Sequence, residues 1–436
     1  MIDDDAVIKR LERAIGPNRV LTGDSARAYG TNGFSPFVAV VPEDREQTAE
    51  VVRIASELHA GLVVRGGGTT LGWEPAPSGV VMSLSTERLR EVVQHEPRDL
   101  TVTVEAGVVL GELNAMLASH RQRLSIDPPH ADRATLGGIS AANDSGPLRH
   151  RYGTMRDLTL GMEVIGAEGV VTHSGGRVVK NVAGYDMHRL HIGAFGSLGV
   201  ITEMTFRLQP LAEAFRLVIV RCGDGEQAEQ CIASIVGGRT QPVLMELVTP
   251  FGDAKMARDL GNGLVDPDGW TVVVGYEDCR EAVAWQCEHL ADGGSGAIPA
   301  TASAEALDEV ASTALYEAVR EWPGQPAPVA FKATMKSSQV TAFHAWAGER
   351  GFRLLSHAAN GIVYGRSDDP ECVEAGEDLS AVAADGAGQL TWTSLPSGAD
   401  VEIWRPARGD LPVMRRIKEA FDPEGIFAPG RWLDVM

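Results

Sequence analysis

Apolar runs and helical periods alternate in the first part of the chain. Residues 37–41 (FVAVV) predict a buried strand, and residues 46–59 predict an amphipathic helix because apolar side chains recur there at helical spacing. A second short strand is predicted at 62–65 (LVVR), and it runs directly into the glycine-rich segment RGGGTTLG at 65–72. The pattern therefore predicts a β-α-β unit whose glycine-rich loop follows its second strand.

Further strands and helices are predicted before the glycine loops end near Pro210. The run LTVTVEAG at 100–107 alternates apolar and polar residues, which is typical of a half-buried antiparallel strand. The other expected elements are a strand at 80–84, a helix at 111–120, a hairpin over 158–176 that turns at 167–169, and a strand at 199–211.

A second region follows, in which glycine loops are absent and helices and strands are mixed. This pattern predicts an α+β domain. Its expected elements are a strand at 216–221, a helix at 226–236, a strand at 271–275, helices at 279–291 and 338–349, and a strand-rich run at 352–365. A last amphipathic helix is predicted at 411–421, where DPEG ends it.

Length and charge narrow the class of protein. The 436 residues are enough for two domains. The formal net charge of −20 argues against nucleic acid or an anionic membrane surface as a partner, because both repel acidic proteins. No apolar run approaches the roughly 20 residues needed to span a bilayer, and the N-terminus has no secretory pattern.

The cysteines indicate the compartment and exclude one kind of centre. They stand at 222, 231, 279, 287 and 372, without a C-x-x-C pair. Metal and iron–sulfur sites need clustered thiolates, so we expect reduced, structural thiols in a cytoplasmic protein and no metal on this chain. Any iron–sulfur centre that serves it must then lie on another chain.

Three glycine-rich segments occur within 150 residues, at 65–72, 132–147 and 193–199. Adjacent glycines let backbone N–H groups converge on an anion, although a single cluster can equally be a tight turn. In the second segment Thr135 is predicted to cap a short helix that opens with glycines and continues with small residues. Three segments together predict a long ligand with several anchoring points, and FAD has that shape.

The chain lacks two other nucleotide-binding motifs, the dinucleotide-binding fingerprint and the P-loop. A G-x-G-x-x-G pattern beginning at Gly66 would need glycine at position 71, which is Leu71, and the loop follows the second strand rather than the first. No G-x-x-x-x-G-K-[ST] string occurs. A nicotinamide-dependent dehydrogenase and an ATP-binding protein are therefore both disfavoured.

The order of these segments resembles the FAD-binding domain of the vanillyl-alcohol oxidase and p-cresol methylhydroxylase superfamily. VVRGGGTTLG resembles its pyrophosphate loop, ATLGGISAANDSG its second cofactor loop, and KNVAGYDMHRLHIGAFGSLGVITEMTFRL the signature of its glycolate and D-lactate dehydrogenases. RRIKEAFDPEGIFAPGR resembles the closing segment in which a final helix returns to the FAD domain. Within the superfamily the chain is most similar to the FAD-binding E subunit of glycolate oxidase.

The resemblance implies an α+β architecture in three parts. Residues 1–210, with a core at 35–210, would form the two-subdomain FAD-binding domain. Residues 211–405 would form a smaller α+β cap or substrate domain, and residues 406–436 would return to the FAD domain.

The resemblance also assigns site residues. Lys180 and Asn181 would lie beside the isoalloxazine, while Gly193 and Gly196 are interpreted as tight-packing residues. The remaining cofactor-binding residues would be Arg65, Gly66, Gly67, Gly68, Thr69 and Thr70 at the pyrophosphate, Thr135, Gly137, Gly138 and Asn143 along the flavin, and Gly199, Val200 and Ile201 where the chain passes it. Covalent attachment in this superfamily uses a histidine in the first loop or a cysteine in the second. Neither is present at 66–73 or 132–147, so we expect non-covalent FAD.

The catalytic apparatus departs from the family pattern. Metal-dependent members carry H-x-G-D-G-N-x-H in the second domain, but the corresponding SHAANGIVYG at 356–365 holds His357 without a second histidine. A lone histidine is more often structural, and Lys180 can equally be a solvated strand end. The candidate catalytic residues are therefore Lys180, Tyr185 and His357.

Two functions remain open. The first is an FAD-dependent enzyme, or enzyme subunit, that oxidises a small 2-hydroxy acid such as glycolate or D-lactate and passes electrons to a partner. The second is a non-catalytic FAD-binding relay or structural subunit of a glycolate-oxidase-like complex. Both imply a homologous flavin subunit and an iron–sulfur subunit, which could place a cytoplasmic chain at the inner membrane face.

Overall fold

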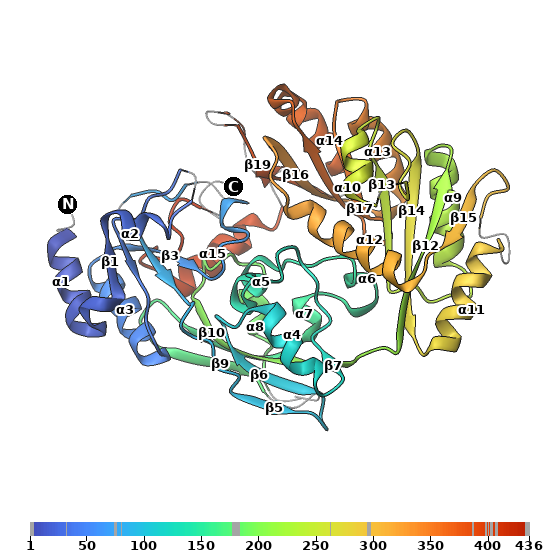
Figure 1. Cartoon of the computed structure of the whole chain (residues 1–436). Helices are drawn as coiled ribbons and strands as arrows, with labels where there is room; N and C mark the ends of the chain where they lie inside the picture. The colour runs from blue at the N-terminus through green and yellow to red at the C-terminus, as the bar shows by residue number, and fades with distance from the viewer. Residues whose placement is uncertain are drawn as a thin grey trace.

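The computed structural model describes most of the chain. The described residues are 4–31, 33–73, 76–79, 81–176, 184–261, 263–293, 298–385, 388–396, 399, 401, 404–405 and 409–431. They fold into three successive sheets with helices around them, and the fold is α+β as expected (Figure 1).

The first sheet carries the predicted β-α-β unit. Strands β2 and β3 both pair in parallel with β4, and β1 adds an antiparallel edge, so the order is β1-β2-β4-β3. The N-cap Asp44 starts α3 by accepting the N–H of Gln47 at 2.7 Å, and the apolar face of α3 packs into the core of this sheet. The elements are α1 Asp4–Ile15, β1 Val20–Thr22, α2 Gly23–Arg27, β2 Val38–Val40, α3 Arg45–Glu57, β3 Gly61–Arg65 and β4 Val81–Ser85.

The second sheet is antiparallel, in the order β5-β6-β10-β8-β9. The predicted hairpin is β8 and β9. The expectation that β6 is half-buried is wrong, because Thr103 is buried as well as the valines and bonds Thr205 of β10 at 2.9 Å between hydroxyl oxygens. The elements are β5 Gln94–Glu96, β6 Thr101–Glu105, α4 Leu110–Ala118, β7 Gln122–Arg123, α5 Leu136–Ala142, α6 Arg149–Tyr152, α7 Met155–Leu158, β8 Thr159–Ile165, β9 Val171–Gly175, α8 His188–His191, β10 Val200–Arg207 and β11 Gln209–Pro210, which pairs with β7.

The third sheet has nine antiparallel strands in the order β15-β12-β14-β13-β17-β18-β16-β19-β20. Two separate apolar clusters cover its two faces, which explains why its strands read as continuous apolar runs. The elements are β12 Ala214–Cys222, α9 Gly225–Val236, β13 Leu244–Thr249, α10 Ala254–Asp259, β14 Trp270–Asp278, α11 Arg280–Ala291, β15 Ser303–Ala306, α12 Glu309–Glu321, β16 Val329–Thr334, α13 Val340–Gly348, β17 Arg353–His357, β18 Ile362–Ser367, α14 Gly376–Asp385, β19 Gln389–Ser394 and β20 Trp404–Arg405.

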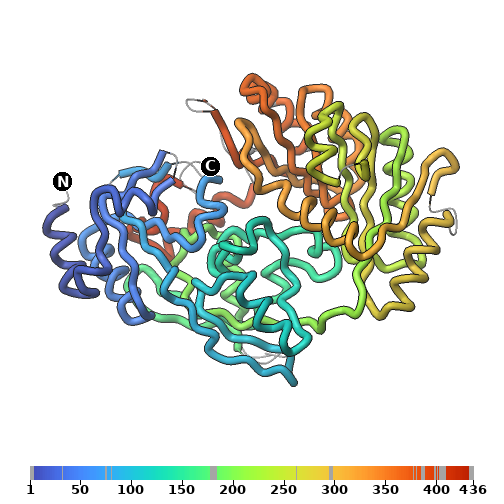
Figure 2. Tube along the Cα trace, viewed as in Figure 1, coloured from blue at the N-terminus to red at the C-terminus, as the bar shows by residue number. Residues whose placement is uncertain are grey.

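The C-terminal segment returns to the first sheet (Figure 2). Helix α15 (Leu411–Phe421) is followed by Phe427, which forms a parallel bridge with Leu62 of β3. Lys418 donates to the carbonyl oxygens of Ser197 and Phe427, both at 2.8 Å. This return was expected from the resemblance and is confirmed. The boundaries at 210/211 and 405/406 stay predictions.

Candidate functional site: a glycine-lined pocket and an adjoining cleft

The loop after β3 packs against the loop before α5. Thr135 is the N-cap of α5, as expected, and its Oγ1 accepts the N–H of Gly138 at 3.4 Å and that of Gly67 at 3.3 Å. A Cβ on Gly66 would collide with the Thr135 side chain, and one on Gly67 would collide with the carbonyl oxygen of Arg133. The two glycines are therefore required by the packing of one loop on the other.

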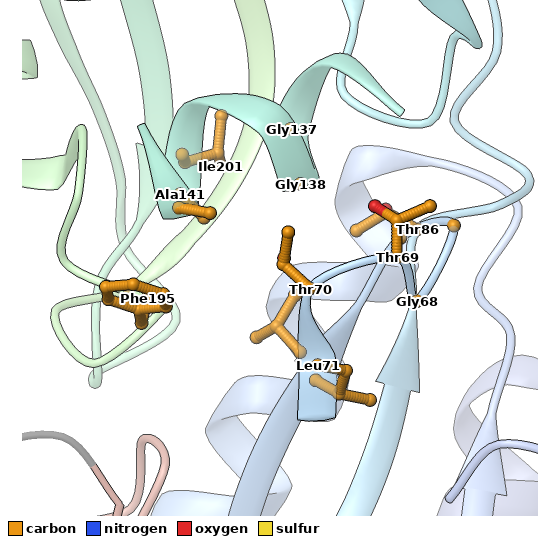
Figure 3. Close-up of a pocket in the computed structure, with 16 residues that line it drawn as sticks. Gly68, Thr69, Thr70, Leu71, Thr86, Gly137, Gly138, Ala141, Phe195 and Ile201 are labelled. Atoms are coloured by element: carbon orange, nitrogen blue, oxygen red, sulfur yellow. The ribbon is translucent and has the colours of Figure 1, made fainter. Parts of the chain in front are cut away.

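A pocket opens between these two loops and the segment that leads into β10. Figure 3 shows Gly137, Gly138 and Ala141 of α5 across from Thr69 and Thr70 of the first loop. Every side chain that lines it is uncharged. The lining residues are Val64, Gly66, Gly67, Gly68, Thr69, Thr70, Leu71, Thr86, Gly137, Gly138, Ala141, Ala142, Phe195, Gly196, Gly199 and Ile201.

Most of the predicted cofactor-binding residues meet in this pocket. All three glycine-rich segments contribute to it, and they lie far apart in the sequence. Thr86, Phe195 and Gly196 also line it but were not predicted; Gly196 had been interpreted as a packing residue. A Cβ on Gly138 would meet only the Thr135 hydroxyl, at 3.2 Å, so that glycine leaves pocket space open rather than serving packing.

Four predicted cofactor-binding residues that the structure describes lie outside the lining, and one of them is Thr135, the N-cap of α5. The Arg65 guanidinium packs beside Gly68 but does not line the pocket, and its Nη1 donates to the carbonyl oxygens of Ala28 and Gly30, at 3.0 and 3.1 Å. Asn143 ends α5 in the left-handed conformation, with φ of 46°. Val200 is fully buried in the core of the first sheet. These residues support the pocket walls rather than form them.

Comparison with known proteins agrees with this geometry. A family model described as "FAD binding domain" matches residues 36–175, and one described as "FAD linked oxidases, C-terminal domain" matches residues 407–432. The structure of p-cresol methylhydroxylase with substrate bound superimposes with a TM-score of 0.75 at 17% identity, covering 98% of this chain and 96% of that one. The chain therefore contains an FAD-binding domain and the C-terminal segment of FAD-linked oxidases, and it shares the fold of p-cresol methylhydroxylase.

Two curated relatives narrow the type. D-lactate dehydrogenase of Archaeoglobus fulgidus is 27% identical, over 91% of each chain. Glycolate oxidase subunit GlcE of Escherichia coli is 40% identical over 29% of this chain and 36% of its own. This FAD-binding oxidoreductase is thus of the glycolate oxidase and D-lactate dehydrogenase type, and its cofactor is FAD.

The two predicted catalytic residues that the structure describes, Tyr185 and His357, do not gather at the FAD pocket. Lys180 and Asn181 lie outside the described residues. The Tyr185 side chain is 87% exposed. His357, at the end of β17, is 2% exposed, and its Nδ1 lies 2.8 Å from Oε2 of the fully buried Glu246 on β13. Neither Tyr185 nor His357 lines the pocket, and the catalytic roles of all three residues stay predictions.

A second hollow adjoins the FAD pocket. This interdomain cleft, of about 640 Å³, lies between the first loop and the nine-stranded sheet, and it shares Gly68, Thr69 and Thr70 with the FAD pocket. Trp73 and Asp144 line it from the FAD-binding side, and Ala330 of β16 from the sheet. A small molecule in the cleft would therefore lie next to the cofactor loop.

Buried charges stand behind the wall of this cleft. Burial raises the pKa of Asp144, while the nearby ammonium of Lys332 works in the opposite direction. Burial lowers the pKa of Lys332, and Asp144 partly offsets that effect. Burial also raises the pKa of Glu246 and lowers the pKa of His357. Because perturbed ionisable groups gather at functional sites, this cluster marks the cleft as a candidate substrate site.

The described residues offer neither a metal cluster nor a membrane-spanning helix. In the part of the chain that the structure describes, no group of three or more His, Cys, Asp or Glu side chains is placed to hold a metal ion. All five cysteines are free thiols. No helix among the described residues is long and apolar enough to cross a bilayer.

Proposed function

We propose that this chain oxidises a small 2-hydroxy acid in the interdomain cleft. The observation that carries the proposal is that the cleft adjoins the FAD pocket: the two share Gly68, Thr69 and Thr70, so a substrate in the cleft would lie next to the loop that we expect to hold the cofactor's pyrophosphate. The similarity to D-lactate dehydrogenase over 91% of the chain supports the substrate class. When bound, FAD would accept the α-hydride of the substrate.

The chain's own residues would bind FAD mainly through the backbone. Because no lining side chain is charged, the pyrophosphate would be held by N–H groups of residues 66–70 and by the hydroxyls of Thr69 and Thr70. The glycines leave a cradle without side chains, which fits a large, flat cofactor. We expect the FAD to be non-covalent, so that acid precipitation of the protein releases all of the flavin into the supernatant.

Protein groups must also take the hydroxyl proton of the substrate. Of the predicted catalytic residues in the described part of the chain, His357 is the one within the buried cluster behind the cleft. Glu246 holds its Nδ1, which leaves Nε2 without a hydrogen-bond partner among the described residues. His357 is the proposed base. This role requires an ionised Glu246 that accepts the N–H of Nδ1, because Nε2 is then able to accept a proton.

Electrons would leave through partner chains. A homologous flavin subunit and an iron–sulfur subunit are proposed, because the scattered free cysteines offer no cluster ligands. We propose a cytoplasmic location, with any contact to the inner membrane face made through those subunits.

A second candidate function is a non-catalytic FAD subunit. The absence of a second histidine in SHAANGIVYG favours it, together with the 40% identity to GlcE over 126 residues.

One experiment separates the two. The purified chain, with its FAD, is mixed anaerobically with glycolate or D-lactate while the visible absorbance of oxidised flavin is followed. Bleaching supports the enzyme. Bound flavin that neither acid reduces contradicts the first function and supports the second, whereas a protein without flavin contradicts both.

A further inference from the structure

Lys332 carries an ammonium group without a hydrogen-bonding partner in the described part of the chain. Its Nζ lies 5.5 Å from the ring centroid of Trp73 and 5.7 Å from that of Tyr364. Tyr364 is its partner on the neighbouring strand β18, and Trp73 comes from the FAD-binding side. No carboxylate or hydrogen-bond acceptor lies within bonding distance of Nζ among the described residues. The charge is thus bordered by aromatic faces from two domains.

This arrangement leaves the ammonium incompletely satisfied. Cation–π contacts stabilise a charge by about 0.5–2 kcal/mol each, but they provide no acceptors for its three N–H donors. Asp144 is near enough to favour the charged form of Lys332, yet the two form no ion pair. A half-buried ammonium that keeps its donors open is suited to receive an anion.

Lys332 does not itself line the interdomain cleft, but its ammonium lies beside residues that do. Trp73 and Asp144, its neighbours from the FAD-binding side, both line that cleft. Ala330 lines it too, and Ala330 stands two residues before Lys332 on β16, so the two side chains share a face of the strand. An anion bound at Nζ would therefore be placed in the hollow that borders the cofactor loop.

The surrounding residues limit the anion that fits. Asp144, on the same wall, opposes a second negative charge, which favours a single carboxylate. Tyr364 follows His357 by seven residues. In the pattern H-x-G-D-G-N-x-H of the metal-dependent relatives, that position holds the second histidine. The Tyr364 ring lies 5.4 Å from the His357 ring, measured between centroids. The Lys332 cation thus lies beside the residue that takes the position of the second histidine.

We propose that Lys332 binds the carboxylate of a small monocarboxylic substrate and so positions its α-carbon toward the FAD pocket. This inference rests on the proposed function for the oxidation itself, but the anion site can be tested without any turnover. Pyruvate is a suitable probe, because it has the carboxylate but no α-hydrogen to give up as hydride.

The test compares Lys332→Met with Lys336→Met in the FAD-loaded chain. Lys336 is an exposed lysine just beyond the same strand, so its substitution removes the same charge outside the cleft. Pyruvate binding is followed through the change in flavin absorbance, and KM for D-lactate through turnover with an artificial electron-accepting dye that reoxidises the flavin. Because a charge-assisted hydrogen bond is lost, we expect Lys332→Met to raise the dissociation constant for pyruvate and KM for D-lactate by about 10- to 100-fold. Lys336→Met should leave them unchanged, and Lys332→Arg should restore most of the affinity.

The outcomes also separate this inference from the proposed function. The role of Lys332 is overturned if Lys332→Met has normal FAD content and keeps the wild-type affinity for pyruvate and the wild-type KM for D-lactate. This holds even if D-lactate reduces the wild-type flavin. Conversely, pyruvate binding that depends on Lys332 in a chain that no hydroxy acid reduces upholds the anion site and contradicts the proposed function. A wild-type chain that binds FAD but not pyruvate contradicts the inference. If Lys332→Met fails to fold, the arginine variant decides, because loss of pyruvate binding in a folded Lys332→Arg protein with normal thermal stability also counts against the inference.

Discussion

The FAD pocket and the surroundings of the interdomain cleft differ in the charge of their side chains. The pocket is lined by glycines, threonines and small apolar residues, with no charge in its lining. Asp144 lines the cleft, and Glu246, Lys332 and His357 are further ionisable side chains that are buried or half-buried. Cofactor binding should therefore depend on backbone shape and tolerate little added volume, whereas substrate binding should depend on charge and respond to pH.

The largest expected effect is the loss of FAD from Gly67→Ala. Its added Cβ would collide with the carbonyl oxygen of Arg133 and force the two cofactor loops apart, whereas a Cβ on Gly72 meets nothing within 4 Å. We expect Gly67→Ala to weaken FAD binding at least tenfold, since overpacking costs about 1–3 kcal/mol. The flavin-to-protein ratio after gel filtration measures it, with Gly72→Ala as the control. A fully loaded Gly67→Ala protein would show that the loops do not need this contact.

The same contrast explains what could be predicted from the sequence. Glycine-rich loops are local signals, because the backbone conformation that they permit is encoded in adjacent residues. Residues 66–70, 137–138 and 199 were found in this way, and so was the cap at Thr135. Phe195 was not, because an aromatic residue before a glycine has many possible roles.

The charged and aromatic residues near the cleft have no comparable local pattern in the sequence. Trp73, Asp144, Lys332 and Tyr364 come from separate segments, and only the pairing of β16 with β18 and the placement of the sheet bring them together. Each is ordinary in isolation. The fold of the nine-stranded region was also the least predictable, because strands that are buried on both faces lack the alternation that marks a strand.

A pH-dependent contact between the segment before α5 and helix α12 is expected at Asp127. Its carboxylate accepts the N–H of Leu148 at 3.0 Å and the hydroxyl of Tyr316 on α12 at 2.9 Å. Burial raises its pKa to about 7. The folded state therefore keeps a proton that the unfolded chain releases near pH 4, and the associated stability is lost as pH rises from about 4 to 7.

The Asp127→Asn variant removes this titration. We expect the free energy of unfolding of the wild-type protein to fall relative to the variant, by up to about 4 kcal/mol, between pH 4.5 and 7.5. Urea unfolding followed by tryptophan fluorescence at both pH values gives the difference. Parallel pH dependence in the two proteins would mean that Asp127 keeps an ordinary pKa.

A smaller loss of stability is expected from Glu246→Ala. The substitution removes the partner of His357 Nδ1 in a fully buried position, and an unpaired buried group costs about 1–3 kcal/mol. Glu246→Gln keeps the shape and a hydrogen-bonding group, so it should cost less. Denaturant midpoints of both variants measure the effect, while FAD content should stay normal because the pair lies outside the FAD pocket. Equal stability of the alanine and wild-type proteins would contradict the assigned contact.

The smallest expected effect concerns the charge state of Lys332. The carboxylate of Asp144 raises the pKa of Lys332 against the lowering by burial, so Asp144→Asn should lower that pKa further. If the ammonium binds the substrate carboxylate, KM for D-lactate rises with pH as Lys332 loses its proton, and in Asp144→Asn the rise begins at lower pH. Flavin reduction rates measured from pH 6 to 10 give both profiles.

The same loss of negative charge in Asp144→Asn should improve binding of a dicarboxylate such as 2-oxoglutarate relative to pyruvate, because the repulsion of its second carboxylate is removed. Identical KM profiles and an unchanged binding ratio would separate Asp144 from the anion site and leave Lys332 without an electrostatic partner in the cleft.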